Sequence, residues 1–190
     1  MELDLIFEEE KKPGTTSAWD KTVPIIAKGN TVTAYLMSEV YEPEVYNELC
    51  YTLEHTDAEQ VRLMINNNGG QLDAMLSILD SMSRCNSEIV GVLSGSVASA
   101  ATMIALACDK LEVAPHTSWL THYYSGGFSG KGNEIEAKYK FESVEIPRMF
   151  KDIHKGFLTP AEITKVINGK DMWLSTKDIK ERFAKMKEVR

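Results

Sequence analysis

IVGVLSGSVASAATMIALA, residues 89–107, is the stretch that decides the fold. Its first five residues are apolar and rich in branched side chains, which is typical of a buried strand. Gly95 then supplies a flexible turn, and an Ala-rich segment with almost no polar side chain follows. The stretch therefore predicts a strand, a tight turn and a helix, with Ser99 where the turn becomes the helix.

Ser99 has two ordinary explanations and one chemical one. It can cap the helix with its hydroxyl, or it can pack as a small residue beside a close neighbour. It can also be a nucleophile at a helix N-terminus, where backbone N–H groups and the helix dipole favour developing negative charge. By itself the stretch favours the ordinary explanations.

Composition narrows the class of protein. The chain has 190 residues, 43% hydrophobic and 26% charged, which predicts one soluble domain with a substantial core. Its net charge of −7 argues against a nucleic-acid partner. No run approaches the roughly 20 apolar residues that span a membrane, and the acidic start does not resemble a signal peptide. We therefore expect neither nucleic acid nor membrane as a partner.

The three cysteines, Cys50, Cys85 and Cys108, have neither metal-ligand nor disulfide spacing. All three lie in apolar helical patterns, so we expect buried thiols. Free thiols suit a reducing compartment, so the predicted location is the cytoplasm.

Strands and helices alternate along the chain. Five strands are expected, at residues 31–37, 61–65, 89–93, 110–113 and 118–122. Helices between several of them predict an α/β fold with repeated βα units and a mainly parallel sheet. Sites in such sheets form at the carboxyl ends of strands, where Gly69-Gly70, Ser99 and His122 all fall.

The remaining segments are assigned by composition. Residues 1–22 predict a flexible N-terminal arm, and residues 23–190 one domain. A loop with four glycines, residues 123–132, precedes a long charged helix at 133–155, which Pro147 should kink or break. Two later helices open with capping patterns at Thr159 and Ser175.

Acyl transfer by a serine needs a base, a group that orients the base, and donors for the oxyanion. Of four histidines only His122 ends an apolar strand, although a structural role suits it too. Asp171 is either a local cap or the acceptor that holds the His122 tautomer. Gly69-Gly70 is either a tight turn with positive φ or a source of free backbone N–H groups.

Several other chemistries lack their motifs. Ser99 is not in G-x-S-x-G, the glycines at 126–132 do not form a P-loop, and no dinucleotide or metal motif occurs. We expect no metal and no cofactor.

Together these residues resemble the family of the Clp protease proteolytic subunit, ClpP, a compartmentalised serine peptidase. The resemblance runs from about residue 63 to 183. Ile65–Gly70 resembles I-N-S-P-G-G, and Gly95–Ala100 resembles G-x-A-A-S-M. Leu120-Thr121-His122 with the glycines after it resembles M-I-H-Q-P-x-G-G-x-x-G-Q. Lys170–Ser175 resembles R-D-x-F-L-S.

The resemblance implies a ClpP/crotonase-like fold with a protruding handle, a strand plus a long helix at about 123–156. It implies that Ser99 attacks the peptide carbonyl, His122 transfers the proton and Asp171 orients His122. Backbone N–H groups of Gly70 and Ala100 would form the oxyanion hole. The Gly-rich segment from Ser125 to Gly132 would bind the substrate backbone by β-augmentation. The implied substrate-binding residues are Gly69, Ser125, Gly126, Gly127 and Phe128.

The implied partners are protein or peptide substrates and further copies of the chain, as a heptamer or a tetradecamer of two rings. The family also docks a hexameric ATPase unfoldase. Arg62 and Met64 replace tyrosines of that docking pocket, and an arginine weakens an apolar groove. Asn67-Asn68 replaces Ser-Pro before the glycines, which predicts a looser turn. Divergent copies of this kind are encoded by some tailed bacteriophages, where they resemble head-maturation proteases. The resemblance therefore implies the cytoplasm of a bacterial cell or of a phage-infected host.

The leading hypothesis is thus a serine endopeptidase that cleaves unfolded or threaded proteins inside a ring. A catalytically silent ring or scaffold subunit of the same fold is the second hypothesis. A crotonase-like acyl-CoA enzyme is the third, and the presence of Ser99, His122 and Asp171 disfavours it because that chemistry does not need them.

Overall fold

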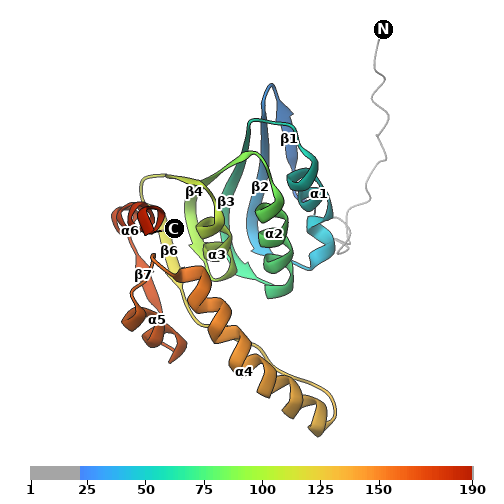
Figure 1. Ribbon diagram of the computed structural model, residues 1–190, viewed down its shortest axis with the longest axis vertical. Helices are drawn as coiled ribbons and strands as arrows, with labels where there is room; N and C mark the ends of the chain where they lie inside the picture. The colour runs from blue at the N-terminus through green and yellow to red at the C-terminus, as the bar shows by residue number, and fades with distance from the viewer. Residues whose placement is uncertain (1–21, 190) are drawn as a thin grey trace, which may run out of the picture.

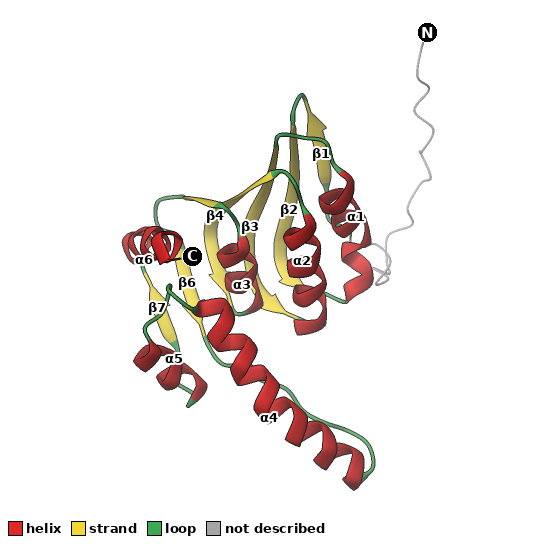
Figure 2. Cartoon of the chain, in the orientation of Figure 1, coloured by secondary structure: helices red, strands yellow, loops and turns green. Residues whose placement is uncertain are grey.

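The structure is a computed structural model that describes residues 22–189. The expected arm, residues 1–22, lies outside the described residues except for Thr22. Within the described part the chain folds around one seven-stranded sheet, with helices on one face and a long helix that projects from the body (Figures 1 and 2).

The sheet has the order β1-β2-β3-β4-β6-β7, and β5 pairs with the first part of β4. β2 to β6 run parallel, whereas β1 and β7 pair antiparallel at the two edges. The mainly parallel α/β sheet expected from the sequence is confirmed. The strands are Ile25–Lys28 (β1), Thr31–Val40 (β2), Gln60–Gly70 (β3), Glu88–Ala98 (β4), Lys110–Val113 (β5), Ser118–Thr121 (β6) and Met172–Leu174 (β7).

The core lies between the sheet and the helices α1, α2 and α3, which cover one face (Figure 2). The side chains of β3 alternate between the two faces of the sheet. Val61, Leu63 and Ile65 are fully buried, whereas Arg62 and Met64 between them are half-exposed. The helices are Pro43–Tyr46 (a 3₁₀ turn), Asn47–His55 (α1), Leu72–Arg84 (α2), Ala100–Ala107 (α3), Gly132–His154 (α4), Pro160–Ile167 (α5) and Thr176–Val189 (α6).

The projecting helix α4 corrects one expectation. Pro147 neither ends it nor divides it, and 23 residues form one continuous helix. The proline removes one N–H and leaves the carbonyl of Ser143, four residues earlier, without its helical donor. Ser143 is exposed, so water can satisfy that carbonyl. The predicted long helix after the glycine-rich loop is otherwise confirmed.

Local sequence signals set several other boundaries. Both capping patterns are real, because Glu162 accepts a hydrogen bond from the Thr159 N–H and Asp178 accepts one from the Ser175 N–H. The expectation of three buried thiols holds fully for Cys108 alone, where burial raises the pKa to about 12. Cys50 in α1 and Cys85, which directly follows α2, are only partly buried.

Candidate active site

Ser99 connects the end of β4 to the start of α3. It occupies the N-cap position of α3, yet its side chain makes no capping hydrogen bond. Its backbone is fixed on both sides, because its N–H donates to the Leu120 carbonyl at 2.9 Å and its carbonyl accepts from the Thr102 N–H at 2.9 Å. The capping explanation is therefore wrong for this serine. The Ser99 hydroxyl is therefore not used to cap α3.

The backbone of Ser99 is strained. Its φ of 55° and ψ of −127° lie where residues with a Cβ are rarely found. Such a conformation costs on the order of 1–3 kcal/mol and persists only where the surroundings impose it. The sheet bond to Leu120 and the fully buried Ala100 supply that constraint. A serine held in this way, on a strand-to-helix turn, has the placement that a nucleophile needs.

Gly69 lies directly against Ser99. A Cβ built at Gly69 would be 2.5 Å from the Ser99 Cβ and 2.8 Å from the Ala100 nitrogen, and the φ of Gly69 is +87°. Gly70 has a φ of +149°, and a Cβ there would overlap the Val40 carbonyl oxygen. Both glycines therefore allow a close approach of backbones as well as a turn that other residues adopt poorly.

Two asparagine side chains, whose hydrogen bonds were not expected from the sequence, hold this region. The buried Asn67 side chain accepts a hydrogen bond from the Gly69 N–H at 2.8 Å. Asn66 accepts one from the Ser96 N–H at 3.1 Å and so ties β3 to the irregular part of β4. The turn is thus fixed by a side chain rather than loose. An Asn two residues before a glycine is the signal that predicts such a local bond.

His122 directly follows β6 and is partly buried. Its Nδ1 lies 2.7 Å from the carbonyl oxygen of the next residue, Tyr123. A carbonyl oxygen only accepts, so Nδ1 must carry the hydrogen of this bond. In the neutral ring Nε2 then has the free lone pair, which is the state that a general base requires.

Asp171 directly precedes β7, which pairs with β6. The register places Trp119 opposite Leu174 and Thr121 opposite Met172. The next residues in that register are His122 and Asp171, so their positions face each other across the strand pair. Asp171 is exposed, however, and the structure shows no hydrogen bond between its carboxylate and the His122 imidazole.

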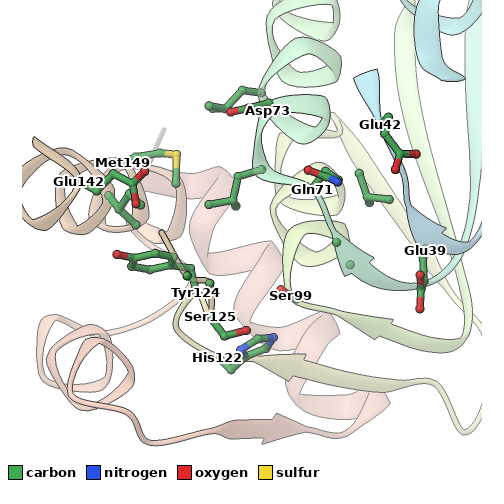
Figure 3. Close-up of a pocket in the computed structure, with 18 of the residues that line it drawn as sticks. Glu39, Glu42, Gln71, Asp73, Ser99, His122, Tyr124, Ser125, Glu142 and Met149 are labelled. Atoms are coloured by element: carbon green, nitrogen blue, oxygen red, sulfur yellow. The ribbon is translucent and has the colours of Figure 1, made fainter. Parts of the chain in front are cut away.

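A cleft of about 1150 Å³ brings most of the candidate residues together (Figure 3). Ser99 and His122 both line it, and Figure 3 shows the histidine beside the serine at one end of the hollow. The cleft also contains Gly69, Gly70, Ser125, Gly126, Gly127 and Phe128. Neither Ala100 nor Asp171 is on its wall. The segment from Tyr124 to Phe128 has no regular secondary structure there and faces α4.

Residues 22–189 contain neither a cluster of metal ligands nor a membrane-spanning helix. No group of three or more His, Cys, Asp or Glu side chains in this part of the chain could hold a metal ion. None of the helices described there is both long enough and apolar enough to cross a membrane.

Comparison with known proteins identifies the family of this chain. The family model described as Clp protease matches residues 24–182. An ATP-dependent Clp protease proteolytic subunit of Bacteroides fragilis is 26% identical over 142 residues, which cover 70% of this chain and 66% of that protein. Subunit 2 of Pseudomonas aeruginosa is 29% identical, over 63% of this chain and 61% of that protein.

The chain thus spans slightly less than two thirds of the length of these two relatives. Subunit 3 of Rhizobium meliloti is 24% identical over 91% of this chain and 90% of its own length. Because the family model covers most of the chain and identity to the relatives is low, this protein is a divergent member of the Clp protease family.

Proposed function

We propose that this chain is a ClpP-like serine endopeptidase with Ser99 as its nucleophile. The observation that carries the proposal is the strained turn at Ser99. Its hydroxyl does not cap α3 and lies in the same cleft as His122. Family membership supports a peptidase, since the relatives are named as protease subunits. The hydroxyl, the strand-end histidine and the nearby glycines together suit acyl transfer.

In the proposed reaction, the Ser99 Oγ attacks the scissile carbonyl carbon while His122 Nε2 takes the hydroxyl proton. The negative charge on the carbonyl oxygen is stabilised by the N–H groups of Gly70 and Ala100. Ala100 is the first residue of α3, so its N–H has no acceptor within the helix. The C–N bond then breaks, the imidazolium protonates the leaving amine, and water hydrolyses the acyl-enzyme by the reverse sequence of proton transfers.

In the active form the Asp171 carboxylate would orient the His122 imidazole. Assembly of several copies of the chain would bring these two groups into contact. The facing positions of Asp171 and His122 support the role, although the Tyr123 carbonyl holds the imidazole in the subunit described here. We propose a homo-oligomeric ring, a heptamer or two stacked heptamers, that encloses the serines. In support, Tyr139, Phe141 and Val144 on the projecting α4 are 59–68% exposed, which suits contact with other copies.

The substrates proposed are unfolded or threaded proteins in the cytoplasm, bound along residues 124–128. Tight docking of an ATPase is not part of the proposal, because Arg62 does not present an apolar surface. Its guanidinium makes two hydrogen bonds to the Glu112 carboxylate, at 2.9 and 2.6 Å. That pair raises the pKa of Arg62 and lowers the pKa of Glu112, so both remain charged.

The decisive experiment labels the assembled wild-type protein with a fluorophosphonate and maps the modified residue. We expect modification at Ser99 and none in the Ser99→Ala variant, with Ser96→Ala as the matched control that still takes up label. Absence of label in a folded, ring-forming protein would refute the peptidase function.

The second candidate is a silent ring or scaffold subunit. One observation favours it, because the Ser99 hydroxyl has no hydrogen-bond partner among the described residues. It predicts that Ser99→Ala changes neither labelling nor peptide turnover.

A further inference from the structure

The cleft beside Ser99 has a strongly acidic lining. Its charged side chains, His122 aside, are five carboxylates and one ammonium group. They are Glu39, Glu42, Asp73, Glu142, Glu145 and Lys138. Because the cleft also holds Ser99 and His122, these charges surround the place where a substrate of the proposed enzyme would lie.

The carboxylates on the α4 side already have basic partners. Glu142 lies 3.7 Å from the Lys138 ammonium, and Glu145 lies 3.4 Å from the Arg148 guanidinium. Lys138 and Arg148 are exposed and the two glutamates are partly buried, and these ion pairs reduce the negative charge of that wall.

The opposite wall is not compensated in this way. Glu39, Glu42 and Asp73 form no ion pair with any residue from 22 to 189. They come from the end of β2, from the start of the 3₁₀ turn and from the first turn of α2. In Figure 3 Glu142 lies at the left, Glu39 and Glu42 lie at the right, and Asp73 lies between them near the top. This wall therefore offers negative charge to whatever enters the cleft.

The spacing of these carboxylates excludes one class of ligand within the described chain. No three acidic, histidine or cysteine side chains there come close enough together to hold a metal ion. Charges spread along a wall instead match several separate cations, such as successive basic side chains of an extended peptide.

Apolar surface lies between the charges. Leu72 and Leu76 line the same wall, and Leu76 is 42% exposed. Phe128 and Met149 line the side of the loop and α4. Lys and Arg combine an aliphatic stem that can cover such surface with a cationic head that can reach a carboxylate. A short acidic side chain offers neither feature.

We propose that this cleft selects peptide segments with Lys or Arg near the scissile bond, and that Glu39, Glu42 and Asp73 determine this selectivity. The inference rests on the proposed peptidase function for the step of cleavage but not for the step of binding. Positive charge near the cleaved bond is favoured, and negative charge there is repelled.

The test compares two quenched fluorescent peptides that are identical except for Lys or Glu on both sides of the cleaved bond. With the assembled full-length protein, we expect kcat/KM to be about tenfold higher for the Lys peptide, the size expected when two exposed charge pairs replace two like-charge contacts. High ionic strength should shrink this ratio. The triple variant Glu39→Gln, Glu42→Gln, Asp73→Asn should bring the ratio close to one.

The matched control removes three exposed charges that do not line the cleft, through Glu44→Gln, Glu48→Gln and Asp57→Asn. It has the same net charge as the cleft variant and should keep the wild-type ratio. Charge reversal by Glu42→Lys should lower turnover of the Lys peptide and raise that of the Glu peptide. Equal wild-type rates, or an equal loss of selectivity in the control, would overturn the proposal.

Binding separates this proposal from the proposed function. Fluorescence anisotropy with the Ser99→Ala variant measures the affinity for both peptides without cleavage. If fluorophosphonate does not react at Ser99 but the Lys peptide binds more tightly, the peptidase function fails and the selectivity stands. If Ser99 is labelled and the two peptides bind and react equally, the function stands and the selectivity fails.

Discussion

His122, directly after β6, and Asp171, directly before β7, occupy facing positions, yet the imidazole donates its Nδ1 hydrogen to the Tyr123 carbonyl and not to the Asp171 carboxylate. The fold thus supplies two acceptors for one donor. A carbonyl bond fixes the tautomer in which Nε2 is free, while a carboxylate would also stabilise the imidazolium formed during catalysis. The difference between these acceptors can be measured.

Asp171→Asn should lower kcat/KM for peptide cleavage by about 10- to 1000-fold, less than His122→Gln, because the Tyr123 carbonyl still orients the ring. Steady-state kinetics of assembled protein across a pH series checks this. Glu188→Gln, an exposed change on α6, is the control and should leave the rate unchanged. Equal rates for wild type and Asp171→Asn would exclude a catalytic role for the carboxylate.

Gly69→Ala should destabilise the fold by about 1–3 kcal/mol, because of its positive φ and because the new methyl group meets Ser99 and Ala100. Fluorophosphonate labelling of Ser99 should also be lost. Chemical denaturation measures the free energy of unfolding. Gly132→Ala is the control, since nothing lies within 4 Å of a Cβ there. Normal labelling in Gly69→Ala would show that the close approach to Ser99 is not required.

Ser99→Gly should be more stable than Ser99→Ala by about 1 kcal/mol, because glycine adopts a φ of 55° without a Cβ penalty. The melting temperatures of the two variants test this order directly. Ser96, in β4 and without positive φ, provides the comparison. There the glycine variant should be the less stable of the two. The same order at both positions would mean that Ser99 carries no conformational strain.

Glu162 should make stability depend on pH. Arg182 makes hydrogen bonds to both its carboxylate oxygens, at 3.0 and 2.8 Å, and this bonding lowers the pKa of Glu162 from 4.5 to about 2. Because the folded-state pKa is the lower one, the stabilisation is complete above pH 4.5 and is lost as the pH falls towards 2.

Glu162→Gln should therefore cost about 1–3 kcal/mol at neutral pH and little at the acid end of that window. Denaturation curves across the pH range give the difference. The exposed pair Lys177–Glu181, 3.9 Å apart, supplies the control, and Glu181→Gln should change stability by less than about 0.5 kcal/mol. A penalty for Glu162→Gln that does not vary with pH would rule out ionisation as its cause.

Local signals in the sequence predicted much of the fold. The alternating apolar pattern gave the parallel strands, and β5 matches its expected range from Lys110 to Val113. The edge strands β1 and β7 were missed, because strands of four and three residues are too short to show periodicity. Pro147 was expected to kink or break the long helix, and the helix continues through it, since the carbonyl that loses its donor belongs to the exposed Ser143 and is open to water.

Some features of the candidate site follow from local sequence, and others follow only from tertiary contacts. The sequence by itself determined the placement of the candidate residues Ser99 and His122, at a turn and at a strand end, because strand ends and turns are encoded by neighbouring residues. Only the tertiary structure decided that Gly69 lies against Ser99, that the Tyr123 carbonyl rather than Asp171 accepts a hydrogen bond from the imidazole, and that three carboxylates distant in sequence line the same cleft. These relationships depend on strand register and on where helices pack. Long-range contacts, rather than local patterns, fix both.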